Sequence, residues 1–94
     1  MSSTLYIRVT GRGTRESLAR YLYDSATLHY AYEDDGEILA VVEVTHTVQV
    51  RPDADFARVF GAMGERLRAH TEHQASRLSS GNYGAKITEE PEVD

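Results

Sequence analysis

The sequence lacks cysteine and tryptophan and contains only two prolines. Because there is no cysteine, the chain has no disulfide bond and no thiolate ligand for a metal, and packing must supply its stability. Apolar runs are also short, and none approaches the roughly 18–20 residues needed to span a bilayer. Residues 1–4 have neither the basic start nor the apolar segment of a secretory signal. We therefore expect a cytoplasmic protein that does not contact a membrane.

Lysine is nearly absent as well, since nine of the ten basic residues are arginine. The net charge of −5 is unevenly distributed: residues 21–50 contain six acidic residues and no Lys or Arg, whereas residues 1–20 contain four Arg and one Glu. Nonspecific nucleic-acid affinity depends on Lys and Arg contacts to phosphates, so this composition argues against direct nucleic-acid binding. The acidic middle segment is either ordinary solubilising charge or a surface for a basic partner.

The length and hydrophobic content indicate one domain with a single core. The chain has 94 residues, of which 40% are hydrophobic, and this is enough apolar material for a folded domain. No internal repeat or linker divides the sequence. We assign residues 1–88 to a single α+β domain and residues 89–94 to an acidic C-terminal tail.

The clearest local signal is a pair of alternating apolar segments around an acidic turn. Apolar residues alternate with others over residues 28–33 and again over residues 38–44, which predicts a β-hairpin. A two-residue loop, Asp35 and Gly36, would pair Tyr32 with Leu39. A three-residue loop that starts one residue earlier would pair Tyr32 with Ile38. The longer loop gathers all the apolar side chains on one face, so we predict that register.

Other strands and two helices flank the hairpin. Residues 4–10 alternate like a strand, and the strand after the hairpin turn alternates as far as residue 50, so these two are expected to pair. Thr14 is a candidate N-cap for a short helix that ends near residues 24 and 25. The main helix is predicted to begin at Pro52 and Asp53 and to end at residues 79–81.

The main helix carries a stripe of side chains within roughly 120° of its circumference. The first half of the stripe is apolar and the second half is largely polar, so we expect the helix to pack at its start and to leave the core near its end. The stripe comprises Phe56, Val59, Phe60, Met63, Leu67, His70, Thr71, Gln74 and Leu78.

The element order is β-α-β-β-α, with or without a final strand over residues 82–88. This order predicts an α+β fold of the ferredoxin-like β-α-β-β-α(-β) type, an antiparallel sheet with two helices packed on one face. The side chains predicted to meet the helices are Leu5, Ile7, Val9, Leu28, Tyr30, Tyr32, Ile38, Ala40, Val42 and Val44. The opposite, open face would present Tyr6, Arg8, His29, Ala31, Leu39, Val41, Glu43 and Thr45. This open face is either a plain solvated surface or a contact surface for a ligand or a second subunit.

Histidines are the main candidates for chemistry. His70 and His73 are three apart on the main helix and can share a face, but a metal needs a third ligand and Glu72 points away from that face. The zincin pattern places its histidines four apart, so this segment does not fit it. His29 on the predicted open face is either a surface residue or a general base. We predict no metal and no cofactor.

These observations favour a small acidic, non-enzymatic module that binds another protein. One specific form is an inhibitor or antitoxin-like partner of a basic nucleic-acid-binding protein, of the kind carried by phages and mobile elements. The partner-binding residues would be Glu33, Asp34, Asp35, Glu37 and Glu43.

A second hypothesis keeps enzymatic activity open. Ferredoxin-like chains of this length often pair sheet to sheet into dimeric α/β barrels that enclose a small-molecule pocket. In such a homodimer, the pocket would be lined by Tyr6, Arg8, His29 and Glu43. The first hypothesis predicts a basic protein partner, and the second predicts self-association.

Overall fold

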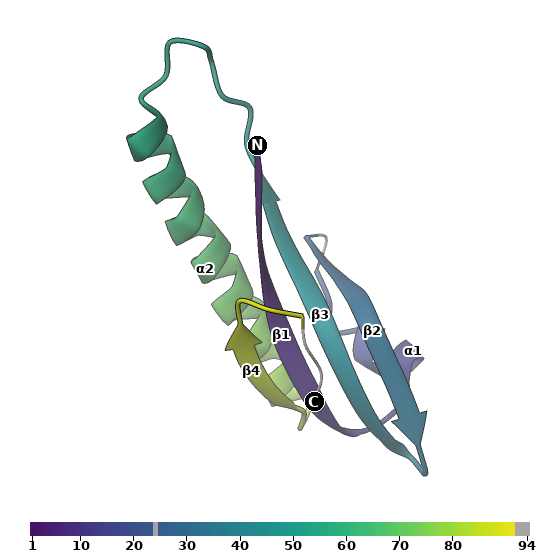
Figure 1. The fold of residues 1–94 in the computed structure, drawn as a ribbon. Coiled ribbons are helices and arrows are strands. Elements are labelled where there is room, and N and C mark those ends of the chain that lie inside the picture. Colours follow the sequence, from purple (N-terminus) through teal and green to yellow (C-terminus); the bar gives the residue numbers. More distant parts are fainter. Residues whose placement is uncertain (24, 92–94) are drawn as a thin grey trace.

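The computed structural model describes residues 1–23 and 25–91. Over these residues the chain forms β1 (Ser2–Arg12), α1 (Arg15–Ala19), β2 (Ala26–Asp34), β3 (Glu37–Thr47), α2 (Phe56–Ser80) and β4 (Gly84–Thr88). The four strands make one antiparallel sheet in the order β2-β3-β1-β4 (Figure 1). This confirms an α+β protein with an antiparallel sheet and two helices. Neither of these helices is long and apolar enough to cross a membrane.

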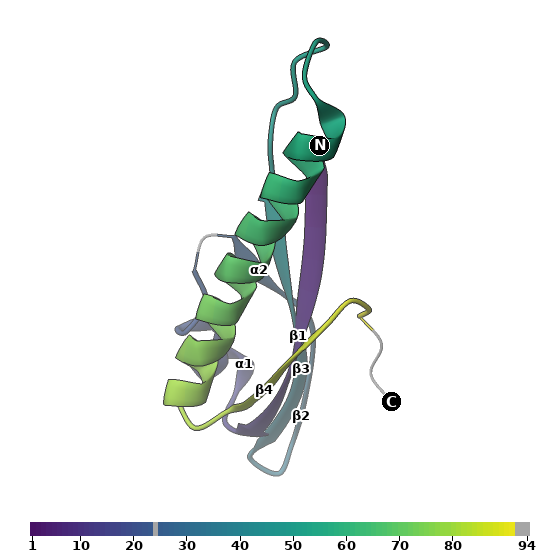
Figure 2. The same ribbon diagram turned by 90° about the vertical axis from the view of Figure 1, so that its left-hand side faces the viewer.

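Both helices pack on the same face of the sheet. Leu18 of α1 and Leu67 and Leu78 of α2 belong to one buried cluster with the inward side chains of the strands. Figure 2 shows α2 running along this face, while the opposite, open face carries neither helix. The cluster includes the strand residues Ile7, Val9, Ile38, Ala40, Val42 and Val44. Alternation in the sequence thus identified the buried side of β1 and β3 correctly.

β1 lies in the middle of the sheet because it has a partner on each edge. It pairs with β3 over its whole length, from Ser2 opposite Thr47 to Arg12 opposite Glu37, which confirms the predicted pairing of the first and third strands. Its other edge pairs with β4, so residues 82–88 do contain a strand. β3 ends three residues before the predicted residue 50. Residues 92–94 of the predicted acidic tail lie outside the described part of the chain.

The hairpin between β2 and β3 has the two-residue loop, so the predicted three-residue loop is wrong. Tyr32 pairs with Leu39 rather than with Ile38. Asp35 and Gly36 have φ angles of 51° and 78°, the left-handed values that a tight hairpin turn of the I′ kind requires at both central positions. Asp and Gly tolerate these values, which explains why the shorter loop is stable here.

β2 pairs with β3 in two registers, because the pairing shifts by one residue between Leu28 and Tyr30. Leu28 pairs with Val42 and packs against the core, on the predicted side of the sheet. Beyond the shift the strand is displaced by one residue, so Ala31 packs against the core in place of Tyr30 and Tyr32. Both tyrosines are exposed, and their predicted position beneath the helices is therefore wrong. The predicted position of Ala31 on the open face is wrong for the same reason.

α1 begins where the sequence predicts and ends earlier. Thr14 is its N-cap, and the Thr14 side chain accepts a hydrogen bond from the backbone N–H of Ser17. The helix ends at Ala19 rather than near residues 24 and 25. Beyond Ala19 the backbone N–H groups of Tyr21 and Leu22 donate to carbonyl oxygens three residues back instead of four, and the N–H of Tyr23 donates to the side chain of Gln74 on α2.

α2 packs from Met63 to its C-terminal end and leaves its first turns outside the core, which is the opposite of the predicted polarity. Its N-cap is Asp55, two residues after the predicted Asp53, and it ends at Ser80 as expected. Phe56 and Phe60 in its first turns are about half exposed. Residues 48–55 carry the chain past the end of the sheet, so α2 begins beyond that end (Figure 1). The buried helix residues are Met63, Leu67, Thr71, Gln74 and Leu78.

Candidate functional site

The acidic residues Glu33, Asp34, Asp35 and Glu37 gather at one end of the molecule, and we call residues 33–37 the hairpin tip. The protein is elongated, with extents of 54 × 24 × 18 Å. The hairpin tip lies at the opposite end from the connection between β3 and α2 (Figure 1). All four acidic residues are exposed. The tip is therefore a small acidic surface carried on a tight turn.

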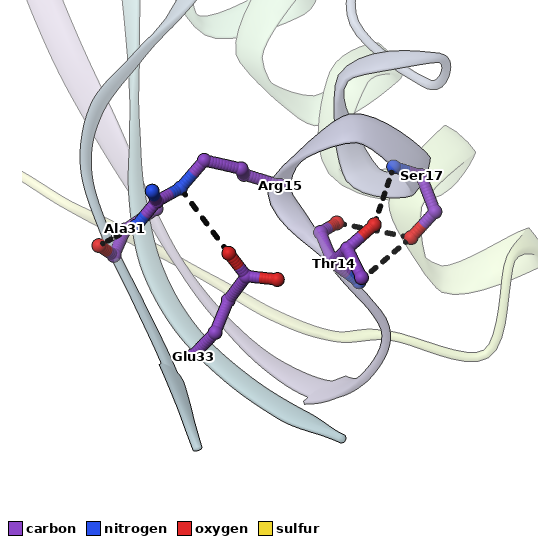
Figure 3. Close-up of polar contacts among 5 residues, drawn as sticks. All are labelled: Thr14, Arg15, Ser17, Ala31 and Glu33. Atoms are coloured by element: carbon purple, nitrogen blue, oxygen red, sulfur yellow. Dashed lines mark hydrogen bonds and ion pairs between the residues drawn. The ribbon is translucent and has the colours of Figure 1, made fainter. Parts of the chain in front are cut away.

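Two arginines from outside the hairpin neutralise part of this charge. Arg15 Nε lies 3.4 Å from Glu33 Oε2, and Arg15 Nη2 donates to the carbonyl oxygen of Ala31 at 2.8 Å (Figure 3). Arg12 Nη1 lies 3.8 Å from Glu37 Oε1. Exposed ion pairs of this kind contribute little to stability. Their main effect is on the charge of the tip, because they offset two of its four carboxylates.

The loop between β1 and α1 positions both arginines. The backbone N–H of Gly13 donates to the carbonyl oxygen of Gly36 at 2.9 Å, which ties this loop to the hairpin turn. A Cβ atom at Gly13 would lie 2.5 Å from Tyr83 Oη, so a larger side chain does not fit. Tyr83 Oη and Ser17 Oγ are hydrogen-bonded at 3.0 Å, and Ser17 completes the capping box with Thr14 (Figure 3). Gly13 therefore serves the packing of this loop against Tyr83 and the hairpin turn.

Asp34 and Asp35 form no ion pair within the residues that the structure describes. Asp34 also borders an open hollow of about 460 Å³ at the hairpin end of the sheet. Tyr32 and Leu39 line the same hollow and give it apolar surface. Glu37 and Arg12 line it as well, and these two side chains form an ion pair with each other. Arginine and lysine bury their alkyl stems on apolar surface and keep their charged ends near carboxylates. Because Arg12 offsets Glu37, Asp34 is the carboxylate of the hollow that can receive a further long cationic side chain.

Tyr6, His29 and Glu43 form a second cluster on the open face, as the alternation predicted. His29 Nδ1 lies 3.3 Å from Glu43 Oε2, and the His29 ring meets the Tyr6 ring edge to face with centroids 5.6 Å apart. Glu43 is six residues from Glu37 along β3, or about 20 Å. The structure thus divides the predicted partner-binding residues between the hairpin tip and this cluster.

Arg8, Leu39 and Val41 occupy the middle of the open face. Arg8 lies opposite Val41 on the neighbouring strand, and Val41 in turn lies opposite Tyr30. Val41 is fully buried although no helix covers this face, and Leu39 is half-buried. The open face is therefore a tightly packed surface with apolar groups at its centre.

Sequence reasoning missed three residues of the open face: Tyr30, Tyr32 and Lys86. The two tyrosines were assigned to the wrong face with the wrong hairpin loop, although the adjacent Asp35 and Gly36 are a strong signal for the two-residue turn. Lys86 lies opposite Arg8 on β4. The side of the sheet on which Lys86 lies was predictable from the alternation of the last strand, because its neighbours Ala85 and Ile87 pack against the core on the other side.

The helical histidines have different neighbours. The His73 ring stacks on Tyr23, with centroids 5.1 Å apart and planes at 15°. The His70 ring lies 5.5 Å from His46 of β3. Among residues 1–23 and 25–91, no group of three or more His, Cys, Asp or Glu side chains is placed to hold a metal ion. These rings act in packing contacts between α2 and the rest of the fold.

Comparison with protein families, with curated proteins and with solved structures found no match. The hairpin tip, the adjoining hollow and the open face are therefore the surfaces on which we base a function.

Proposed function

We propose that this chain is a non-enzymatic protein-binding module whose hairpin tip and adjoining hollow receive a basic surface of a partner protein. The observation that carries the proposal is the setting of Asp34. Its carboxylate is exposed, has no ion pair within the described residues, and borders a hollow with Tyr32 and Leu39. This combination of negative charge and apolar surface favours an arginine or a lysine.

The contact would use two kinds of interaction at once. The carboxylate of Asp34 accepts charge-assisted hydrogen bonds from the cationic group, which are stronger than bonds between neutral groups. The face of the Tyr32 ring attracts the same cation through its π electrons. The remaining charge of the tip attracts a basic partner from a distance and raises the association rate. Binding should therefore weaken as salt is added.

The partner class that we propose is a basic nucleic-acid-binding protein. Such a protein carries Arg and Lys where it contacts phosphates. Carboxylates at the hairpin tip would occupy those groups in place of phosphates, which is the action of an inhibitor or an antitoxin.

We also propose that the fold is of the ferredoxin-like type. The position of β3 between β1 and β2 in the sheet supports this assignment.

The test is to capture partners from a nuclease-treated lysate of the native host at low salt and to measure their affinity with purified proteins. The hairpin variant is Asp34→Lys with Asp35→Asn, because Asn keeps the left-handed φ at position 35. The matched control is Glu89→Lys with Glu90→Gln, which changes the net charge equally at a site away from the tip. Circular dichroism checks that both variants fold.

We expect the hairpin variant to bind a basic partner at least tenfold more weakly than the wild type and with a shallower salt dependence. The control variant should retain the wild-type affinity. Equal losses in the two variants would show that only net charge matters, and equal retention would show that the hairpin tip is not the binding surface. Either result would overturn the proposal.

A further inference from the structure

Arg8 and Lys86 form a like-charged pair on the open face of the sheet. They lie directly opposite each other on β1 and β4, and both line one hollow together with Thr10 and Leu39. Neither forms an ion pair within residues 1–23 and 25–91. Like charges in directly opposed positions destabilise a sheet. The pair therefore points to a negatively charged or electron-rich group that comes from outside the chain.

The other half of the same face carries groups of the opposite kind. β3 and β2 present the carboxylate of Glu43 and the rings of Tyr30 and Tyr32, whose residues are 45% and 55% exposed. The faces of such rings attract cations. In Figure 1 these two strands form the right-hand half of the sheet, and the cationic strands β1 and β4 form the left-hand half. The open face is therefore complementary to itself.

We propose that the open face binds a second copy of this chain. The two open faces would face each other across a two-fold axis that is parallel to the strands and lies over the gap between β1 and β3. This axis places β4 of one copy over β2 of the other, and β1 of one copy over β3 of the other. One row across the sheet consists of Lys86, Arg8, Val41 and Tyr30.

The two-fold axis places this row of one copy over the same row of the other copy, with the order of the residues reversed. Lys86 of each copy lies over Tyr30 of the other, in the arrangement of a cation above a ring. Arg8 of each copy lies over Val41 of the other, and Glu43 is two residues further along the same strand. A long Arg8 side chain reaches that carboxylate, so each copy supplies the anion that the cationic pair of the other copy lacks.

The area of the open face suits such a dimer. The four strands have 11, 9, 11 and 5 residues, so at a spacing of about 4.8 Å and about 3.4 Å per residue they present roughly 600 Å² in plan. A standard protein interface buries about 800 Å² on each partner. Self-association goes beyond the proposed partner binding and does not depend on it, because its charged contacts are made by Arg8, Lys86 and Glu43 rather than by Asp34. The two surfaces adjoin at Leu39, which lines both hollows.

The experiment is sedimentation of the full chain from micromolar to millimolar concentration, with charge-swapped variants. The first variant is Arg8→Glu with Lys86→Glu, and the second is Tyr30→Arg with Glu43→Lys. Each variant alone should dissociate about a hundredfold more readily than the wild type, because like charges then face each other. An equal mixture of the two variants should form heterodimers, since both halves of the interface are complementary again.

Two controls keep the result clear. Arg66→Glu with Arg68→Glu makes the same charge change on the exposed side of α2 and should leave the dimer intact. The milder Arg8→Gln with Lys86→Gln keeps the test open if a reversed charge prevents folding, and it too should weaken the dimer. A wild type that stays monomeric at millimolar concentration would overturn the proposal, as would variants that dimerise like the wild type. A monomer that binds a small anion at Arg8 and Lys86 would overturn it in favour of a ligand site.

Discussion

Gln74 of α2 holds the backbone of Tyr23 through its side-chain amide: the Gln74 Oε1 atom accepts a hydrogen bond from the Tyr23 N–H at 2.8 Å. The other end of the amide donates to the carbonyl oxygen of Tyr21. Gln74 is almost completely buried. This one side chain therefore satisfies two backbone groups in the segment between α1 and β2 and fixes that segment on α2.

Replacing Gln74 with Leu should lower the free energy of unfolding by about 1–3 kcal/mol, because the backbone groups of Tyr21 and Tyr23 lose their partners. Urea unfolding followed by circular dichroism measures the change. The control is Glu72→Leu on the exposed side of the same helix, which should change stability by no more than about 0.5 kcal/mol. Similar losses in both variants would contradict a specific role for the amide.

The two halves of α2 should respond differently to truncation. Leu78→Ala removes a fully buried side chain and should cost about 2–5 kcal/mol of unfolding free energy. Phe60→Ala removes a half-exposed side chain beyond the sheet and should cost no more than about 0.5 kcal/mol. The same urea titration distinguishes them. A larger loss for Phe60 than for Leu78 would restore the polarity that the sequence predicted.

Two glycine substitutions should have opposite effects on stability. Gly36→Ala introduces a Cβ at φ 78° and should lower the free energy of unfolding by about 1 kcal/mol or more. Gly61→Ala should raise it by about 0.5–1 kcal/mol, because the helix gains propensity and no neighbouring atom lies within 4 Å of the new Cβ. Thermal unfolding scans are sufficient for this comparison. A stabilising Gly36→Ala would mean that the hairpin does not form the two-residue turn.

Arg15 should restrain the charge of the hairpin tip. Arg15→Ala releases Glu33 from its ion pair, so a basic partner should bind severalfold more tightly at low salt. Arg20→Ala, an equal charge change at an exposed position outside the tip, is the control and should have a smaller effect. Titration calorimetry gives both affinities. An affinity lowered by Arg15→Ala would instead make this arginine part of the contact.

The sequence predicted the α+β class, the pairing of the first and third strands and the buried side of β1 because these follow from strict alternation of apolar residues. The hairpin register was wrong because Tyr30 and Tyr32 fit either face. A tyrosine has an apolar ring and a polar hydroxyl, and alternation counted it as a core residue. The φ preferences of Asp35 and Gly36 and a register shift near His29 decided the matter instead.

The polarity of α2 was wrong for a related reason. Phe56 and Phe60 are apolar side chains of the kind that fill a hydrophobic core, but the helix starts beyond the end of the sheet. Thr71 and Gln74 look like surface residues, yet both are buried because the backbone satisfies them, with Thr71 Oγ1 donating to the carbonyl oxygen of Leu67 at 2.6 Å. Hydropathy reports the cost of burying a polar group and takes no account of a partner that removes this cost.

The sequence predicted which acidic residues make up the candidate site, but it did not predict which other residues contact them. The acidic run around the turn marked the hairpin tip directly. The ion pairs made by Arg12 and Arg15 join residues far apart in the sequence, so no local pattern indicated that half of the tip charge is offset. The pairing of Arg8 with Lys86 likewise depends on the register of β1 and β4, which only the assembled sheet defines.

The most direct test of the central claim is an NMR titration of the ¹⁵N-labelled chain with its captured basic partner. We expect the largest chemical-shift changes at the backbone amides of Tyr32, Asp34, Asp35 and Gly36, and we expect these changes to disappear at high salt. Changes confined to the exposed first turns of α2, with the hairpin tip unaffected, would contradict it.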